Sequence, residues 1–406
     1  MYKLEGSTLA SGIIARRITL CQTCSYLLMN HCKIWYNYKG MRGEGLPHTQ
    51  QGRHVRPLLD ITTIYHERTV LNYARGREIL ERFASAERIE VPSHWNISGL
   101  HGNEGLAQDW LKIKRNVLVL GVRKTFPVRP NGRSGDFIAS SIASGCGLSC
   151  AYCYVPRHKG FANPISTFVN IEQICSAIER HSTKQGPKVA PNQVDPHLWV
   201  YDIGENSDCS VDALVSDNVK DLVALFRRLP HAKASFATKY VNRELLQYDP
   251  QGKTRIRFSL MPQNIARIVD VRTSKMTERI TAINDFVDAG YEVHLNFSPV
   301  IIYDGWQNDY VALFQQIDAA LSTQAKAQLK SEVIFLIHNE RLHDVNLRWH
   351  PQAEKLLWQP AIQEPKVSEM GGNNVRYKRG LKGQAVAKFC ALLAQTLPYC
   401  TVRYAF

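Results

Sequence analysis

From Ser134 onward, the chain alternates short runs of β-branched and aromatic residues with amphipathic stretches of helical period. This alternation is typical of consecutive βα units, in which parallel strands form one sheet and helices cover it. Six units rather than eight predict an α/β fold, a partial (β/α)6 barrel of the TIM type with its reactive centre at the carboxyl ends of the strands. The six predicted strands are residues 137–143, 198–203, 234–238, 255–260, 292–298 and 333–337.

Amphipathic stretches between these strands predict helices at residues 171–180, 211–228 and 274–289. The last begins near Thr273 or Ser274, which are suitable N-caps, and Gly290 follows it as a helix stop.

Two further segments flank the predicted barrel. A strand at 61–65, a helix at 70–83 and a strand at 116–122 predict a small α/β N-terminal domain. The end of the chain predicts one helix and a final strand at 401–404. The boundaries that we expect are 57–125 for the N-terminal domain, 134–345 for the barrel and 346–406 for a C-terminal extension.

Residues 1–45 differ from the rest because they lack a clear amphipathic period and contain a second methionine, Met41. We expect a disordered leader or a mispredicted start site. The alternative is a small zinc site, although its cysteines lack a second Cys-x2-Cys pair. Its candidate ligands are Cys21, Cys24, His31 and Cys32.

The formal net charge of the 406 residues is +14, and residues 1–160 contribute +11 of it. From Lys366 onward, seven basic residues face one acidic residue, Glu369. This excess favours a polyanionic partner without identifying it, although a solvated basic surface explains it equally well. The candidates for phosphate contact are Arg376, Lys378, Arg379 and Lys382.

No apolar run approaches the ~18 residues that a membrane span needs, so we expect a soluble protein. Ten cysteines are too few for a disulfide scaffold, and no secretory signal opens the sequence. A reducing, cytoplasmic setting is therefore expected, in which clustered cysteines indicate metal or redox chemistry.

Three cysteines directly after the first predicted barrel strand have the spacing Cys-x3-Cys-x2-Cys: Cys146, Cys150 and Cys153. Three thiolates in one loop can ligate three irons of a 4Fe-4S cluster and leave the fourth iron open. The alternative is zinc, which needs a fourth ligand, and the nearest candidate is His158 in the same short loop.

This spacing, with Tyr152 just before the last cysteine, resembles the radical S-adenosylmethionine superfamily. The resemblance implies that the open iron binds S-adenosylmethionine, which one electron cleaves to a 5′-deoxyadenosyl radical. An electron donor such as ferredoxin or flavodoxin is implied as well. Gly204 and Glu205, at the end of the second strand, are similar to the superfamily's Gly-Glu motif, in which glycine admits a ligand to the backbone and a carboxylate receives an ammonium group.

The stretch from Cys146 to the C-terminus resembles the spore photoproduct lyase family, whose members cleave a methylene-bridged thymine dimer in DNA. The similar segments are 145–154, 236–239, 257–259, 298–306 and 399–406. The resemblance implies that Lys239 and Ser259 contact the carboxylate end of S-adenosylmethionine. It places Tyr152 and Tyr154 near the radical, where Tyr154 relays a hydrogen atom.

One position departs from that family. A cysteine three residues before the aspartate of a Ser-Asp pair returns a hydrogen atom to the repaired thymine in the family. Here the pair is Ser207 and Asp208, but the cysteine's place is taken by Glu205. A carboxylic O–H is a far poorer hydrogen-atom donor than S–H, so Cys209 is the candidate replacement.

Three functions remain open. The first is a radical S-adenosylmethionine lyase that repairs a thymine lesion in DNA. The second keeps the radical chemistry but acts on RNA or a small molecule, because Glu205 occupies the cysteine's place. The third is a non-catalytic iron-sulfur protein that binds nucleic acid.

Overall fold

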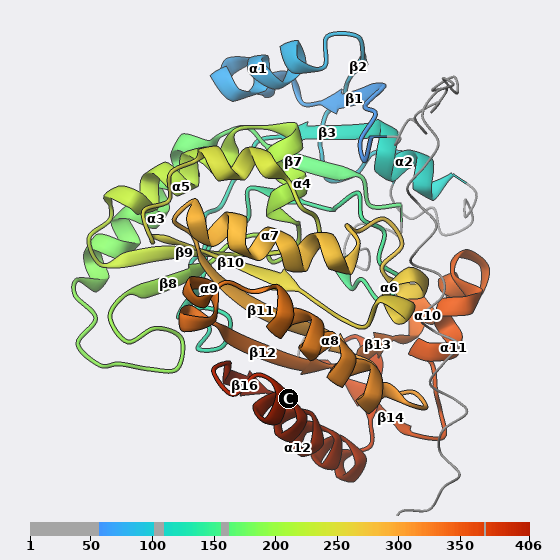
Figure 1. Cartoon of the computed structure of the whole chain (residues 1–406). Helices are drawn as coiled ribbons and strands as arrows, with labels where there is room; N and C mark the ends of the chain where they lie inside the picture. Colours follow the sequence, from blue (N-terminus) through green and yellow to red (C-terminus); the bar gives the residue numbers. More distant parts are fainter. Residues whose placement is uncertain (1–56, 101–108, 156–161, 369–370) are drawn as a thin grey trace, which may run out of the picture. The chain divides into compact units, whose positions relative to one another are not determined.

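The computed structural model describes residues 57–100, 109–155, 162–368 and 371–406 (Figure 1). They belong to one compact unit that spans Arg56–Phe406. The predicted leader and its candidate zinc ligands lie outside the described residues. None of the described helices combines the length and the apolar composition needed to cross a membrane.

An eight-stranded sheet forms the centre of the described unit, in the order β16-β12-β11-β10-β9-β8-β5-β4. From β5 to β12 every neighbouring pair is parallel. The order has two open ends, which confirms a partial barrel. The six strands from the prediction are β5 (Phe137–Ile138), β8 (Trp199–Asp202), β9 (Ala232–Thr238), β10 (Thr254–Ser259), β11 (Glu292–Val300) and β12 (Lys330–Phe335).

Helices cover one face of this sheet, and α7 and α8 lie across β10, β11 and β12 in Figure 1. The ring of Phe286 on α7 meets that of Phe258 on β10 edge-on, with centroids 5.2 Å apart. Helix α7 ends before Gly290, as predicted, where φ is +87°. These outer helices are α3 (Ile171–Gln185), α5 (Asn218–Arg228), α7 (Met276–Asp288) and α8 (Trp306–Ala320).

The prediction of one strand at 137–143 is wrong, because the chain changes sheets within this segment. Strand β5 pairs with β8, whereas β6 (Ala143–Ser144) pairs antiparallel with β7 (Ile165–Phe168) in a second sheet. Residues 139–143 are buried throughout, so no change in hydrophobicity marks the transfer. The cysteine loop therefore follows β6 rather than a barrel strand.

The prediction of one helix at 211–228 is also wrong, because α4 (Cys209–Val215) and α5 are separate. The backbone of Ser216 is extended, and its side chain accepts a hydrogen bond from the Asn218 N–H at 3.4 Å. Such local bonds compete with a continuous helix. The predicted helix at 70–83 is likewise divided, into η1 (Arg68–Asn72) and α1 (Ala74–Arg82).

The second sheet has the order β2-β1-β3-β7-β6 and includes the two strands predicted before the barrel. The first of them is β1 (Thr63–His66), and the second is β3 (Val117–Gly121). Both are parallel to each other, and β3 is parallel to β7. This sheet also includes β2 (Glu87–Glu90), and α2 (Trp110–Asn116) precedes β3.

The C-terminal helix and strand are confirmed as α12 (Arg379–Thr396) and β16 (Thr401–Ala405). Strand β16 pairs parallel with β12 and thus extends the barrel sheet. Before α12, a small antiparallel sheet has the order β13-β15-β14. Its parts and the helices beside it are β13 (Ile337–Asn339), α10 (Glu340–Trp349), α11 (Pro351–Leu357), β14 (Gln363–Val367) and β15 (Asn373–Tyr377). The remaining elements are β4 (Arg129–Pro130), η3 (Arg243–Gln247), α6 (Gln263–Val269) and α9 (Thr323–Gln328).

Candidate active site

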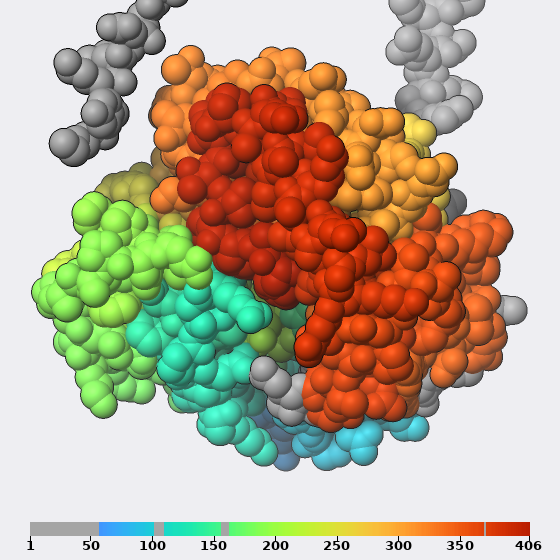
Figure 2. Space-filling model, turned by 90° about the horizontal axis from the view of Figure 1, so that it is seen from below, coloured from blue at the N-terminus to red at the C-terminus, as the bar shows by residue number. Residues whose placement is uncertain are grey.

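A cavity of about 480 Å³ lies where the barrel strands end. Figure 2 shows a depression between the segment near residue 130 and the C-terminal residues, both of which contribute to the lining. The lining includes all of the predicted site residues except Cys209. Those that line it are Cys146, Cys150, Tyr152, Cys153, Tyr154, Gly204, Glu205, Lys239 and Ser259.

The cysteine loop is anchored at its start and in its middle. Gly145 has φ of +90° and donates its N–H to the Asn206 carbonyl at 2.9 Å. A Cβ at this position would lie 2.4 Å from the Pro164 carbonyl oxygen, so only glycine fits. In the middle of the loop, the Ala151 N–H donates to the Val269 carbonyl at 2.8 Å. The three thiols are therefore held at one end of the cavity.

The environment of these thiols fits a bound cationic cluster. Burial raises the pKa of Cys146 and Cys150 well above the ordinary range, and the carboxylates of Asp208 and Asp270 respectively add to this effect. Without a metal the thiols of Cys146 and Cys150 are therefore neutral at physiological pH, whereas iron would stabilise their thiolates. The Leu148 N–H donates to the Cys146 sulfur at 3.4 Å, and such hydrogen bonds help to set the reduction potential of a cluster.

Lys114, on α2, is a cation beside the cysteine loop that the sequence reasoning missed. Its side chain is buried, and its Nζ donates to the Cys146 carbonyl at 3.4 Å. Burial lowers the pKa of Lys114, while the nearby cysteines act in the opposite direction. No local pattern marks this residue, because it is one lysine within a basic stretch far from the cysteines in sequence.

Lys239 follows β9 and places its ammonium group in the lining of the cavity. Its Nζ lies 5.6 Å from the centre of the Tyr152 ring, and no described carboxylate forms an ion pair with it. The Tyr152 hydroxyl donates to Asp270, which in turn pairs with the buried Arg279 at 3.2 Å. The Tyr152 ring is thus fixed by Asp270. The ammonium group of Lys239, which lies over that ring, can bind an anionic ligand.

Asp208 fixes the backbone that carries Lys239. Its carboxylate caps α4 by accepting the N–H groups of Ser210 and Val211. The same carboxylate accepts the Lys239 N–H and the Thr238 hydroxyl, each at 2.8 Å. Burial raises the pKa of Asp208, and the hydrogen bond from the Lys239 backbone opposes that effect. The ends of β8 and β9 are therefore joined through one buried side chain.

Gly204 and Glu205 line the cavity after β8. Gly204 has φ of +89°, a conformation that side chains disfavour. The Glu205 carboxylate pairs with Arg129, and its backbone carbonyl accepts the hydroxyl of Tyr154 at 2.7 Å. Tyr154 is 44% exposed, so its ring is accessible from the cavity.

Ser259 ends β10 and is buried within the cavity lining. Its backbone carbonyl accepts a hydrogen bond from Arg279 at 2.7 Å. Its hydroxyl accepts a weak bond from Asn296 Nδ2 at 3.4 Å, which leaves the hydroxyl proton for a ligand. Ser259 and Lys239 thus face the same cavity from adjacent strands.

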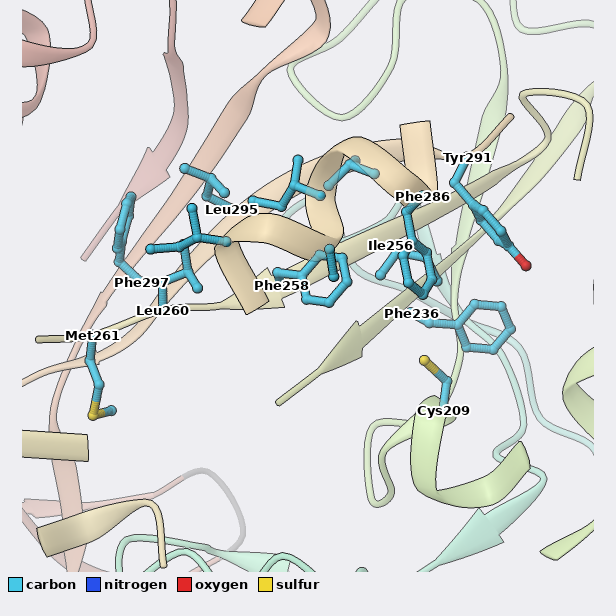
Figure 3. Packing of buried hydrophobic residues seen from close by; sticks show 14 of the residues in the cluster. Cys209, Phe236, Ile256, Phe258, Leu260, Met261, Phe286, Tyr291, Leu295 and Phe297 are labelled. Atoms are coloured by element: carbon cyan, nitrogen blue, oxygen red, sulfur yellow. The ribbon is translucent and has the colours of Figure 1, made fainter. Parts of the chain in front are cut away.

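Cys209 is placed differently from its prediction as a hydrogen donor. It begins α4, is 2% exposed and is not among the described residues that line the cavity. Figure 3 shows its sulfur directed at the core, near Phe236 and below Tyr291. Because the N-cap at Asp208 sets the direction of α4, the next side chain turns into the hydrophobic core. This geometry contradicts a direct role for Cys209 at the cavity.

Comparisons with known proteins give consistent matches. The family model described as spore photoproduct lyase matches residues 60–405. Spore photoproduct lyase of Bacillus subtilis (strain 168) is 28% identical over 278 residues, which cover 67% of this chain and 77% of that relative. The Clostridium acetobutylicum protein of the same name is 27% identical over 273 residues, with the same coverage.

Solved structures show the same fold. A spore photoproduct lyase complexed with dinucleoside spore photoproduct superimposes with a TM-score of 0.77 at 22% identity, over 86% of this chain and all of that one. A mutant of that enzyme with bound S-adenosylmethionine and the same dinucleoside gives equal values.

Proposed function

The chain belongs to the spore photoproduct lyase family of radical S-adenosylmethionine enzymes, and from this premise we propose that it cleaves a methylene-bridged thymine lesion in DNA. The observation that carries the proposal is the shared lining of one cavity by three thiols and an ammonium group without a described carboxylate partner. The thiols suit a 4Fe-4S cluster, and the ammonium suits the carboxylate of S-adenosylmethionine.

When bound, the cluster and S-adenosylmethionine supply a 5′-deoxyadenosyl radical that abstracts a substrate hydrogen. Cys146, Cys150 and Cys153 would hold the cluster. Lys239 and Ser259 would orient the carboxylate end of S-adenosylmethionine, and Tyr152 forms the floor beneath that ammonium.

Gly204 and Glu205 would border the amino end of S-adenosylmethionine. The positive φ of Gly204 leaves its backbone open to a ligand. The Glu205 carboxylate already has a cationic partner, Arg129, so it would be shared between that guanidinium and the incoming ammonium.

Because Cys209 is buried away from the cavity, Tyr154 is the remaining candidate for the hydrogen-atom relay. Its phenolic O–H lines the cavity and donates to the backbone carbonyl of Glu205, the residue that takes the place of the family's cysteine in the sequence. Phenolic O–H is a better hydrogen-atom donor than the carboxylic O–H of Glu205. We therefore assign the return of the hydrogen atom to Tyr154, whose phenoxyl radical would be restored by one electron from the external electron donor and one proton.

Basic groups at the edge of the cavity support DNA as the partner. Phe406 lines the cavity, and its ring lies 4.6 Å from the guanidinium carbon of Arg133 and 5.4 Å from Lys382 Nζ. Burial lowers the pKa of Lys382, and the charges of Lys366, Arg376 and Arg133 lower it further. Bound phosphate groups would reduce the repulsion among these positive charges. Arg376 and Lys378 are engaged with Glu364 and the Ala361 carbonyl.

The test uses anaerobically reconstituted protein with dithionite and S-adenosylmethionine, with and without dinucleoside spore photoproduct. We expect lesion-dependent release of thymine together with 5′-deoxyadenosine. The matched variant is Tyr154→Phe, for which we expect 5′-deoxyadenosine to form while thymine release falls about 100-fold or more, the lower end of the range for loss of a positioned proton carrier.

Formation of 5′-deoxyadenosine without thymine from the wild type would reject this lesion and favour RNA or a small molecule as substrate. Absence of both, from protein with a full complement of iron, would favour the non-catalytic alternative, which family membership does not support. A ferredoxin or flavodoxin as electron donor and a cytoplasmic location stay predictions, as do the domain boundaries.

A further inference from the structure

Three metal-ligating side chains converge in the C-terminal part of the chain, outside the cavity. They are His338 on β13, His343 on α10 and Glu354 on α11. One ligand atom from each lies within 4.8 Å of the others. None of the three is among the described residues that line the cavity. The cluster therefore lies outside the lining of the cavity.

The two histidines each direct one ring nitrogen at the carboxylate of Glu354, within hydrogen-bond distance. Its Oε1 lies 2.9 Å from His338 Nε2, and its Oε2 lies 2.5 Å from His343 Nδ1. His338 is fully buried and Glu354 is 4% exposed, while the side chain of His343 is 18% exposed. A metal ion can thus reach the cluster past His343, and water is otherwise excluded from it.

The ring of His343 is held in place by an aromatic neighbour. It stacks on Trp358, with ring centroids 4.0 Å apart and planes at 11°. His338 also meets the Trp358 ring edge-on at 6.3 Å. Fixed ring planes direct the nitrogen lone pairs, which is the role that surrounding residues have in metal centres.

Asn346 joins this cluster to the cysteine loop. Its Nδ2 donates to Glu354 Oε1 at 2.7 Å and to the Ala151 carbonyl, between Cys150 and Cys153, at 2.6 Å. Its Oδ1 is buried and has no hydrogen-bond partner in the described part of the chain. A water molecule bound to a metal would supply the donor that this oxygen lacks.

We propose that His338, His343 and Glu354 bind one zinc ion, with a water molecule as the fourth ligand. Two imidazoles and one carboxylate are ligands that zinc prefers in tetrahedral sites, whereas calcium and magnesium prefer oxygen ligands alone. The ion joins β13, α10 and α11 and holds Asn346 against the Ala151 carbonyl.

The test is metal analysis of the holoenzyme, purified anaerobically and equilibrated with limiting zinc. We expect one zinc per chain in addition to the iron. X-ray absorption at the zinc edge then identifies the ligands, because nitrogen and oxygen lie at about 2.0–2.2 Å from zinc and thiolate sulfur at about 2.3 Å. A spectrum without sulfur places the zinc outside the cysteine loop.

The variants are His343→Ala and Glu354→Gln, and the matched control is His197→Gln, an exposed histidine. Because changes around a metal site already cost 10- to 100-fold in affinity, we expect loss of a ligand to weaken zinc binding by about 100-fold or more. Iron content is expected to stay at the wild-type value in all three proteins. His343 lies at the rim of the site, so its replacement is expected to leave the fold intact, as circular dichroism would check.

Two results would overturn the proposal. One is wild-type protein that takes up no zinc beyond the level of the His343→Ala variant. The other is zinc with sulfur neighbours, which would place it on the cysteines. Because the readout is zinc rather than turnover, failure of this proposal is distinguishable from failure of the proposed lyase activity.

Discussion

Two lysines at opposite ends of β9 have opposite environments. Lys233, near the start of the strand, pairs with Asp195 at 2.9 Å and with Glu292 at 2.6 Å. Lys239, directly after the strand, has an aromatic ring below it and no described carboxylate in an ion pair with it. The same residue type is thus neutralised within the protein at one end of the barrel and left available at the other.

The environment of Lys233 extends into a network of paired charges. Arg255, at the start of β10, also contacts Asp195 and Glu292, at 3.3 and 2.9 Å. His294 lies 2.8 Å from Glu292. Charged groups that form ion pairs within the protein connect neighbouring strands. Charged groups at the rim of a cavity that form no ion pair remain available to bind a ligand. The contrast predicts that changes at one end affect stability and changes at the other affect binding.

The largest effect is expected at the cavity end, from Cys150→Ala. Loss of one of three cluster ligands leaves the iron site incomplete, so we expect less than about 1% of wild-type 5′-deoxyadenosine formation, the scale of losing an essential cofactor. Iron content and the 5′-deoxyadenosine yield are the measurements. Cys175→Ser, on α3 and away from the cavity, is the control and should retain both. Wild-type yield from Cys150→Ala would contradict the assignment of the cluster.

Lys239→Met is expected to weaken binding of S-adenosylmethionine by about 10- to 100-fold, because hydrogen bonds to charged groups contribute about 1.5–3 kcal/mol. Equilibrium binding to reconstituted protein measures this. The urea midpoint should remain near the wild-type value, since Lys239 has no described ion-pair partner to leave behind. An unchanged affinity would remove Lys239 from the cofactor site.

Lys233→Met is expected to have the opposite result. Asp195 and Glu292 lose one partner but keep Arg255, so we expect a loss of about 2 kcal/mol in the free energy of unfolding, below the range for a fully broken buried pair. Urea denaturation measures it, and the affinity for S-adenosylmethionine should not change. The comparison between the ends of the barrel would fail if Lys233→Met weakened binding of S-adenosylmethionine and Lys239→Met lowered the free energy of unfolding.

The smallest effect is a dependence of stability on pH through His294. Burial lowers the pKa of His294 to about 3, and the charge of Arg255 acts in the same direction. The unfolded chain therefore takes up this proton first, near pH 6.5, and stability falls as the pH drops below that value. Between pH 7.5 and 5.5 the loss is about 1 kcal/mol.

The measurement is the difference in urea midpoints between pH 7.5 and 5.5. His294→Gln should reduce this difference, whereas His197→Gln, at an exposed position, should leave it as in the wild type. An equal pH dependence in wild type and His294→Gln would show that His294 does not stay neutral in the folded protein.

Local patterns were sufficient for the barrel strands from β8 to β12 and for the cysteine loop. Strand-length runs such as those of β9 and β10 contain their own hydrophobic signal, and the Cys146 loop has a spacing that only a few kinds of site use. The order of the sheet followed, because consecutive βα units place their strands side by side.

Other features could not be predicted because they depend on direction or on distant neighbours. The division of residues 137–143 between two sheets leaves the run of buried residues unchanged. Cys209 lies one residue from Asp208, yet the helix that begins there turns it into the core. Lys114 reaches the cysteine loop from α2, 32 residues before Cys146, with no trace in its own segment.

The amino-acid sequence alone therefore determined the kind of chemistry, since the spacing of three thiols in one loop is a local property of the chain. Tertiary structure decided which charges remain available and which side chains meet. Lys233 and Lys239 cannot be distinguished by residue type, and His338, His343 and Glu354 form a cluster only because one strand and two helices fold together. Burial and pairing arise from contacts between segments, which no local pattern contains.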